Sequence, residues 1–152
     1  TRGIDGTKDD DMKKIAVVYY SGTGNTEALA DAVVEGVREA GASAAVISAG
    51  MFSADMLDSF DAFAFGCPAM GSEGLEDEVF EPMFDSLLEH LGGRKVGLFG
   101  SYGWGDGEWM SQWKETTMQS GAVLASEPVI ALDTPDQEAR GKAKALGSAL
   151  AR

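Results

Sequence analysis

The stretch KIAVVYYSGTGNT, residues 14–26, decides the fold of this chain. From Ile15 to Tyr20 it is continuously apolar or aromatic, a pattern typical of a strand covered on both faces rather than exposed to solvent on one. Glycines and hydrogen-bonding side chains follow at once in SGTGNT, and apolar residues then recur at helical spacing. The stretch therefore predicts a buried parallel strand, a short glycine-rich loop and the start of a helix.

The same alternation continues to the end of the chain. The first helix is expected to start near Thr26, to bury a stripe that extends to Ala40, and to end at Gly41. Thr134-Pro135-Asp136-Gln137 predicts the start of the last helix, with Thr134 as its cap and proline in its first turn. Further strands are predicted at 44–47, 62–66, 95–100 and 129–132, and further helices at 53–60, 78–90 and 108–120.

Strands that alternate with helices over short connections leave few topologies. Such crossovers are nearly always right-handed and the strands parallel, so the pattern predicts an α/β fold, a doubly wound three-layer α/β/α sandwich with a five-stranded parallel sheet. Ligands of these folds bind beyond the carboxyl ends of the strands, where the winding direction reverses. The loops after the first, third and fourth strands are therefore the candidates for a binding site.

The composition is that of one compact domain. With 152 residues, of which 44% are hydrophobic, the chain can bury about two-thirds of its unfolded surface, and a second full domain is not expected. Residues 1–11 are polar and aperiodic, so we interpret them as a leader or a disordered tail, and residues 12–152 as the domain. The formal charge of −13 argues against nucleic acid and anionic membranes as partners and favours basic proteins.

Cysteine and histidine occur once each, and this limits the kinds of site that the chain can hold. The single cysteine, Cys67, cannot form an internal disulfide, and the single histidine, His90, cannot complete a Cys/His zinc site. No apolar run approaches the roughly 20 residues needed to span a bilayer. We therefore expect a soluble protein of a reducing, cytoplasmic compartment, monomeric and without a metal site.

The loop after the first strand has the features of a phosphate cradle. Its glycines let successive backbone N–H groups converge at a helix N-terminus, which carries about half a positive charge. Neither the nucleoside-triphosphatase pattern nor the G-x-G-x-x-G pattern is present, and neutral donors must bind the anion because the loop has no lysine or arginine. A glycine-rich turn with a capped helix is the alternative. The cradle consists of Ser21, Gly22, Thr23, Gly24, Asn25 and Thr26.

The loop after the third strand reads GCPAMGSE, residues 66–73. A cysteine phosphatase would need arginine where Glu73 stands, so that chemistry is excluded. A phospho-acceptor receiver domain would need aspartate where Gly66 and Cys67 stand. Cys67 is interpreted as a small buried hydrophobe. Met70 is either core filler or a soft apolar surface for a flat ring.

The loop after the fourth strand displays a tryptophan between glycines. Flanking glycines give Trp104 no side-chain contacts and raise the cost of ordering it, which favours stacking on a ligand over core packing. Trp109 and Trp113, one helical turn apart, are predicted to be core residues. Asp106 or Gly107 is expected to open their helix, and Asp106 is the simpler N-cap. Together the three loops describe a ligand with one phosphate and one aromatic ring system, and FMN fits that description.

In combination, SGTGNT, GCPAMGSE and GSYGWGDG are highly specific, and from Met12 to Arg152 the chain resembles a flavodoxin of the short-chain type. The resemblance implies the strand order 2-1-3-4-5, with FMN at the switch point between the first and third strands. The fifth strand lacks a roughly 20-residue insertion, which makes the chain similar to the short-chain branch.

The resemblance also implies roles for single residues. The cradle holds the phosphate, Met70 and Trp104 sandwich the isoalloxazine, and Ser101 meets the ribityl chain and pyrimidine edge. The carbonyl of Gly71 turns on reduction and accepts the N5 proton, a movement that glycine permits at low cost. Besides the cradle, the expected FMN-binding residues are Pro68, Ala69, Met70, Gly71, Ser72, Glu73, Ser101, Tyr102, Gly103, Trp104, Gly105 and Asp106.

The resulting functional prediction is a low-potential one-electron carrier, not an enzyme. Its FMN would shuttle between semiquinone and hydroquinone, and its acidic face would dock transiently on basic patches of reductases and electron acceptors. The alternative is a flavodoxin-like FMN quinone reductase that uses NAD(P)H, which needs an open flavin face that Met70 and Trp104 would cover. A module that only stores FMN would leave the Gly71 switch without purpose.

Overall fold

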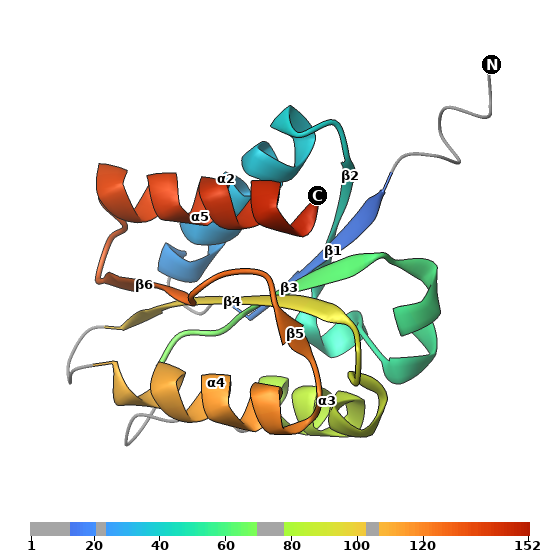
Figure 1. Cartoon of the computed structure of the whole chain (residues 1–152). Helices are drawn as coiled ribbons and strands as arrows, with labels where there is room; N and C mark the ends of the chain where they lie inside the picture. Colours follow the sequence, from blue (N-terminus) through green and yellow to red (C-terminus); the bar gives the residue numbers. More distant parts are fainter. Residues whose placement is uncertain (1–12, 21–23, 70–77, 103–106) are drawn as a thin grey trace, which may run out of the picture.

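A computed structural model of the chain describes residues 13–20, 24–69, 78–102 and 107–152. Its centre is a sheet of parallel strands in the order β2-β1-β3-β4-β5, with β6 also paired to β4, which confirms the predicted order (Figure 1). The strands are β1 (Lys14–Tyr19), β2 (Ser43–Ser48), β3 (Ala62–Gly66), β4 (Lys95–Tyr102), β5 (Val123–Leu124) and β6 (Val129–Leu132).

Helices cover both faces of this sheet, which confirms the three-layer sandwich. Figure 1 shows α2 and α5 together on one face and α3 and α4 together on the other. Short 3-10 turns follow β2 and close α3. The helical elements are α2 (Asn25–Glu39), η1 (Ala49–Met51), η2 (Ala54–Ser59), α3 (Phe80–Leu87), η3 (Leu88–His90), α4 (Glu108–Gln119) and α5 (Gln137–Leu150).

The edge next to β4 differs from the prediction of one fifth strand. β5 pairs with Lys95 and Val96 at the start of β4, and β6 pairs with Phe99 to Tyr102 at its end. The predicted fifth strand is β6. The prediction missed β5 because a strand of two residues is too short to show a period-two pattern.

Several helix boundaries also correct the sequence analysis. Thr134 is not the cap of α5; Asp136 is, and its carboxylate accepts a hydrogen bond of 2.8 Å from the N–H of Ala139. The N-cap of α4 is Gly107, at φ +86°, in place of the predicted Asp106, which lies outside the described residues. The helix predicted at 53–60 is the 3-10 helix Ala54–Ser59, and Ala40 is exposed instead of belonging to the buried stripe.

Asp136→Ala is expected to lower the free energy of unfolding by about 1 kcal/mol, because it removes the side-chain acceptor of a helix N-terminus. Urea unfolding checks this value. Thr134→Ala is the matched control, since the sequence analysis placed the cap there, and it should change the free energy by less than about 0.5 kcal/mol. The reverse order of the two effects would return the cap to Thr134.

Two hydrophobic clusters fill the spaces between the sheet and the helices on its two faces. The cluster under α3 and α4 is aromatic: Phe84 meets Phe65 at 5.2 Å and Trp113 at 5.5 Å between ring centroids, in edge-on geometry. Trp109, Trp113 and Cys67 are all buried, which confirms their prediction as core residues. The cluster under α2 and α5 is aliphatic apart from Phe99 and includes Val33, Ala143 and Leu146.

Candidate functional site

The carboxyl ends of β1, β3 and β4 meet at one edge of the sheet. Backbone hydrogen bonds continue the ladder beyond the strands: the N–H of Tyr20 donates to Gly66 at 2.9 Å, that of Cys67 to Phe99 at 3.1 Å, and that of Ala69 to Ser101 at 2.9 Å. The ladder therefore brings the starts of the three predicted ligand loops side by side, as the sequence analysis expected.

The N-terminus of α2 has no side-chain cap. Its N-cap is Gly24, at φ +93°, a conformation that side chains rarely adopt, and glycine has no side chain to cap the helix. The N–H of Ala28 is the first to find its acceptor within the helix, the carbonyl of Gly24 at 3.0 Å. The amides of Asn25, Thr26 and Glu27 precede it, and amides of a first turn have no partner within their helix. Such an N-terminus favours an anion.

Two residues predicted for opposite ends of the ligand contact each other. The hydroxyl oxygens of Thr26 and Ser101 are 2.8 Å apart, and the two residues are only 1% and 4% exposed. Thr26 was assigned to the phosphate, and Ser101 to the ribityl chain and ring edge. The sequence analysis did not foresee this contact, because the partners are 75 positions apart.

The remaining described site residues lie around Ser101. Pro68 accepts a 3.5 Å contact from the thiol of Cys67, and Ala69 packs against the aromatic cluster. Tyr102 packs on Trp109, with ring centroids 5.4 Å apart. Ser21, Gly22, Thr23, Met70, Gly71, Ser72, Glu73, Gly103, Trp104, Gly105 and Asp106 lie outside the described residues, and their assignments stay predictions.

Asp133, directly after β6, has a left-handed backbone conformation at this edge of the sheet. Its φ of +57° makes it the non-glycine residue at positive φ in the described part of the chain, and its N–H donates to the carbonyl of Tyr102 at 2.6 Å. Aspartate tolerates this conformation better than most residues. The bond ties the loop after β6 to the end of β4.

Two acidic side chains, Glu27 and Asp31, lie in the first two turns of α2. Burial raises the pKa of the Tyr19 hydroxyl at the end of β1, and the carboxylates of Glu27 and Asp31 raise it further. A negative local field disfavours an incoming phosphate, so hydrogen bonds from neutral groups must outweigh it.

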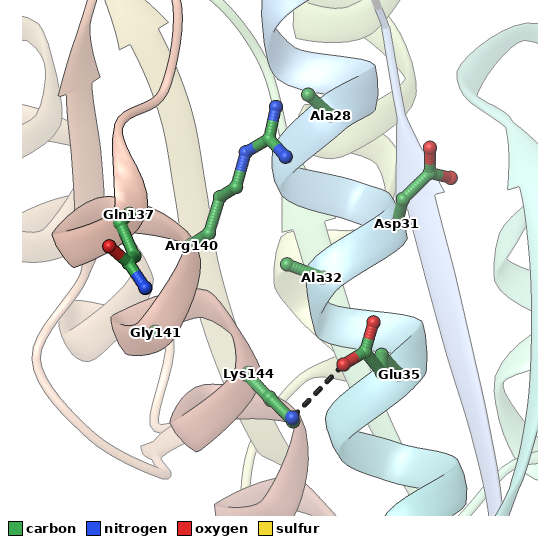
Figure 2. Close-up of a pocket in the computed structure, with 8 residues that line it drawn as sticks. All are labelled: Ala28, Asp31, Ala32, Glu35, Gln137, Arg140, Gly141 and Lys144. Carbon is green, nitrogen blue, oxygen red and sulfur yellow. Dashed lines mark ion pairs between the residues drawn. The ribbon is translucent and has the colours of Figure 1, made fainter.

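A polar surface groove runs between α2 and α5 (Figure 2). One wall carries Asp31 and Glu35 and the other Arg140 and Lys144, and the Lys144 ammonium pairs with Glu35 at 3.0 Å. Figure 2 shows the Arg140 guanidinium beside Ala28, in the first turn of α2. Helical periodicity places Arg140 only on the outer face of α5, so the sequence gives no sign that it lies across this groove from α2.

Two other features, a metal site and a membrane-spanning helix, are absent from the described ranges. In these parts of the chain no three His, Cys, Asp or Glu side chains are grouped so that they could hold a metal ion. None of the helices described is long and apolar enough to cross a membrane.

Comparison with known proteins agrees with this geometry. The flavodoxin family model matches residues 17–145. The flavodoxin of Megasphaera elsdenii is 46% identical over 91% of this chain and 98% of its own, and that of Clostridium beijerinckii is 41% identical over 80% and 88%. The solution structure of the two-electron reduced Megasphaera elsdenii flavodoxin superposes with a TM-score of 0.84 at 47% identity, covering 90% of this chain and 98% of the other.

The parallel sheet, the N-terminus of α2 at its switch point and the similarity over nearly the whole length lead to one assignment. The chain belongs to the flavodoxin family, is of its short-chain type, and is a flavin-binding electron-transfer protein rather than an enzyme.

Proposed function

We propose that the protein is a low-potential one-electron carrier that binds FMN non-covalently. The observation that carries the proposal is the N-terminus of α2, which has no side-chain cap and whose first turn holds the amides of Asn25, Thr26 and Glu27 and the buried hydroxyl of Thr26 as donors for one phosphate group. Such a site fits a mononucleotide flavin and has nothing to offer riboflavin at the same place. When bound, FMN supplies the redox chemistry, while the protein supplies binding, orientation and field.

The chain's own residues would each do one thing toward this cofactor. The cradle, Ser21 to Thr26, binds the phosphate, and the segments from Pro68 to Glu73 and from Ser101 to Asp106 receive the ring. Met70 and Trp104 cover its faces and exclude water. Gly71 would offer a backbone carbonyl that accepts a hydrogen bond from the N5–H of the reduced ring.

Stepwise reduction of the purified protein, followed by its visible spectrum, tests this function. We expect a flavin spectrum with one flavin per chain and a half-reduced form that accumulates before full reduction. The same preparation mixed with NADPH alone should bleach slowly. Rapid bleaching without an added reductase would instead support an NAD(P)H-dependent quinone reductase, and direct two-electron reduction would contradict the carrier.

The charge of the protein supports partners of the opposite sign. A net charge of −13 favours transient, salt-sensitive docking on basic patches of reductases and acceptor proteins in the cytoplasm, with this protein acting as a monomer. Electron-transfer contacts of this kind are small, which allows rapid release.

Ser72→Gly is expected to raise the oxidised/one-electron midpoint potential by about 45 mV. In a type II turn over residues 70–73, which we expect in the reduced form, Ser72 would take a left-handed φ that costs a non-glycine residue about 1 kcal/mol. Glycine removes that cost, and 59 mV corresponds to a factor of ten for one electron. Spectroelectrochemistry measures the shift, and an unchanged midpoint would show that Ser72 is unstrained in the reduced form.

A further inference from the structure

Ser101 connects the three ligand loops at the end of β4. Its hydroxyl lies 2.8 Å from that of Thr26, in the first turn of α2. Its carbonyl accepts the N–H of Ala69 at 2.9 Å, directly before the loop that starts at residue 70. Its own strand ends one residue later at Tyr102. Of these contacts only the one to Thr26 is made by the side chain, so a side-chain substitution at Ser101 acts first on the N-terminus of α2.

The direction of the hydroxyl–hydroxyl bond depends on what else binds Thr26. Each hydroxyl has one proton to donate and lone pairs that accept. An anion at the N-terminus of α2 offers only acceptors, so Thr26 must give its single proton to the anion. The oxygen of Thr26 can then only accept, and Ser101 must be the donor between them. Without an anion, either hydroxyl can donate.

We propose that Ser101 is a positioning residue for the phosphate, and not a contact of the ribityl chain or ring. Its hydroxyl donates to Thr26, and Thr26 donates to the phosphate. Because Ser101 and Thr26 are 4% and 1% exposed, water does not replace this bond, and chained hydrogen bonds in such surroundings strengthen each other. The inference rests on the proposed function, since the phosphate in question is that of FMN.

The two roles of Ser101 make opposite predictions for riboflavin, which has the ring and ribityl chain but no phosphate. We expect Ser101→Ala to weaken FMN binding about five- to tenfold, the size of one lost hydrogen bond, and to leave riboflavin binding within about twofold of the wild type. Fluorescence-quenching titrations of the flavin-free protein with each ligand measure both affinities. Ser101→Cys, which keeps the volume but donates weakly, should reduce the FMN preference in the same way.

We call the chain of hydrogen bonds from Ser101 through Thr26 to the phosphate the relay. A double-mutant cycle shows whether its two hydroxyls act together or independently. Thr26→Val removes the middle of the relay, so adding Ser101→Ala to it should cost no further FMN affinity. Thr117→Val is the matched control: Thr117 is fully buried, and its hydroxyl donates to the carbonyl of Trp113 at 2.8 Å within α4. This variant should lose stability but keep the wild-type preference for FMN over riboflavin.

Parallel losses of FMN and riboflavin affinity in Ser101→Ala would overturn the relay and return Ser101 to the ring or ribityl chain. Additive losses in the double variant would overturn it as well. A wild-type protein that prefers FMN while Ser101→Ala keeps that preference would refute the relay alone. A wild-type protein that binds FMN and riboflavin equally well would refute the proposed phosphate site together with the relay.

Discussion

Gly36→Ala is expected to lower the free energy of unfolding by about 2 kcal/mol or more. A Cβ at Gly36 would lie 1.9 Å from the carbonyl oxygen of Lys144 and 2.7 Å from its carbon. Both are backbone atoms of α5, so no rotamer change relieves the clash, and the two helices must separate. Overpacking of this kind costs about 3 kcal/mol, while the better helix propensity of alanine returns about 1 kcal/mol.

The same crossing holds a second glycine from the opposite side. A Cβ at Gly147 of α5 would meet the carbonyl oxygen of Val33 at 2.1 Å and the amide nitrogen of Val37 at 2.9 Å. The helices therefore approach through their backbones at two reciprocal points. Gly147→Ala should destabilise the protein by a similar amount, and the two effects should not add, since either variant forces the same separation.

Gly141→Ala is the matched control on α5. It lies in the same helix, is exposed, and has no atom within 4 Å of an added Cβ. Alanine there should raise the free energy of unfolding by about 0.5–1 kcal/mol. Urea unfolding followed by circular dichroism, at equal flavin occupancy, compares the three variants. Equal effects at residues 36 and 141 would show that helix propensity, and not the close approach, decides.

Removing the phosphate from the ligand is expected to lower affinity at least about a hundredfold. Two charge-assisted hydrogen bonds to the phosphate, each worth about 1.5–3 kcal/mol, already supply that factor. The amides ahead of Ala28 and the hydroxyl of Thr26 offer more than two donors. Burial raises the pKa of Tyr19 and the carboxylates of Glu27 and Asp31 raise it further, and these two carboxylates oppose part of the gain.

Titration of the flavin-free protein with FMN and with riboflavin tests this expectation directly. Inorganic phosphate provides the control: at high concentration it should compete with FMN and leave riboflavin binding unaffected. Equal affinities for the two flavins would mean that the N-terminus of α2 binds no phosphate. The flavin would then be held by its ring alone.

Much of the fold could be predicted from residues close together in sequence. The run from Ile15 to Tyr20 indicates a buried strand, and the stripe of Ala143, Leu146 and Leu150 indicates a helix that packs on a sheet. The prediction of the α5 cap was wrong because two nearby residues, Thr134 and Asp136, can both cap a helix. The structure has Asp136 in that position, ahead of the helix whose apolar stripe packs on the sheet.

The residue types of the candidate site could likewise be predicted from short stretches of sequence. The contacts between those residues could not. Glycines and neutral donors after the first strand indicate an anion site, and the N-terminus of α2, which has no side-chain cap, agrees with that interpretation. No periodicity relates Thr26 to Ser101 or Arg140 to Ala28, because these pairs come from elements that meet only after both have packed on the sheet.

The sequence by itself determined the alternation of strands and helices and the chemical character of each loop, because burial, helix starts and glycine turns depend on residues only a few positions apart. The tertiary structure alone decided the split edge strand, the backbone contact of α2 with α5 at Gly36 and Gly147, and the hydroxyl pair of Thr26 and Ser101. Each of these features depends on the distance between elements that are far apart in the chain. That distance is fixed only when both elements have packed on the sheet.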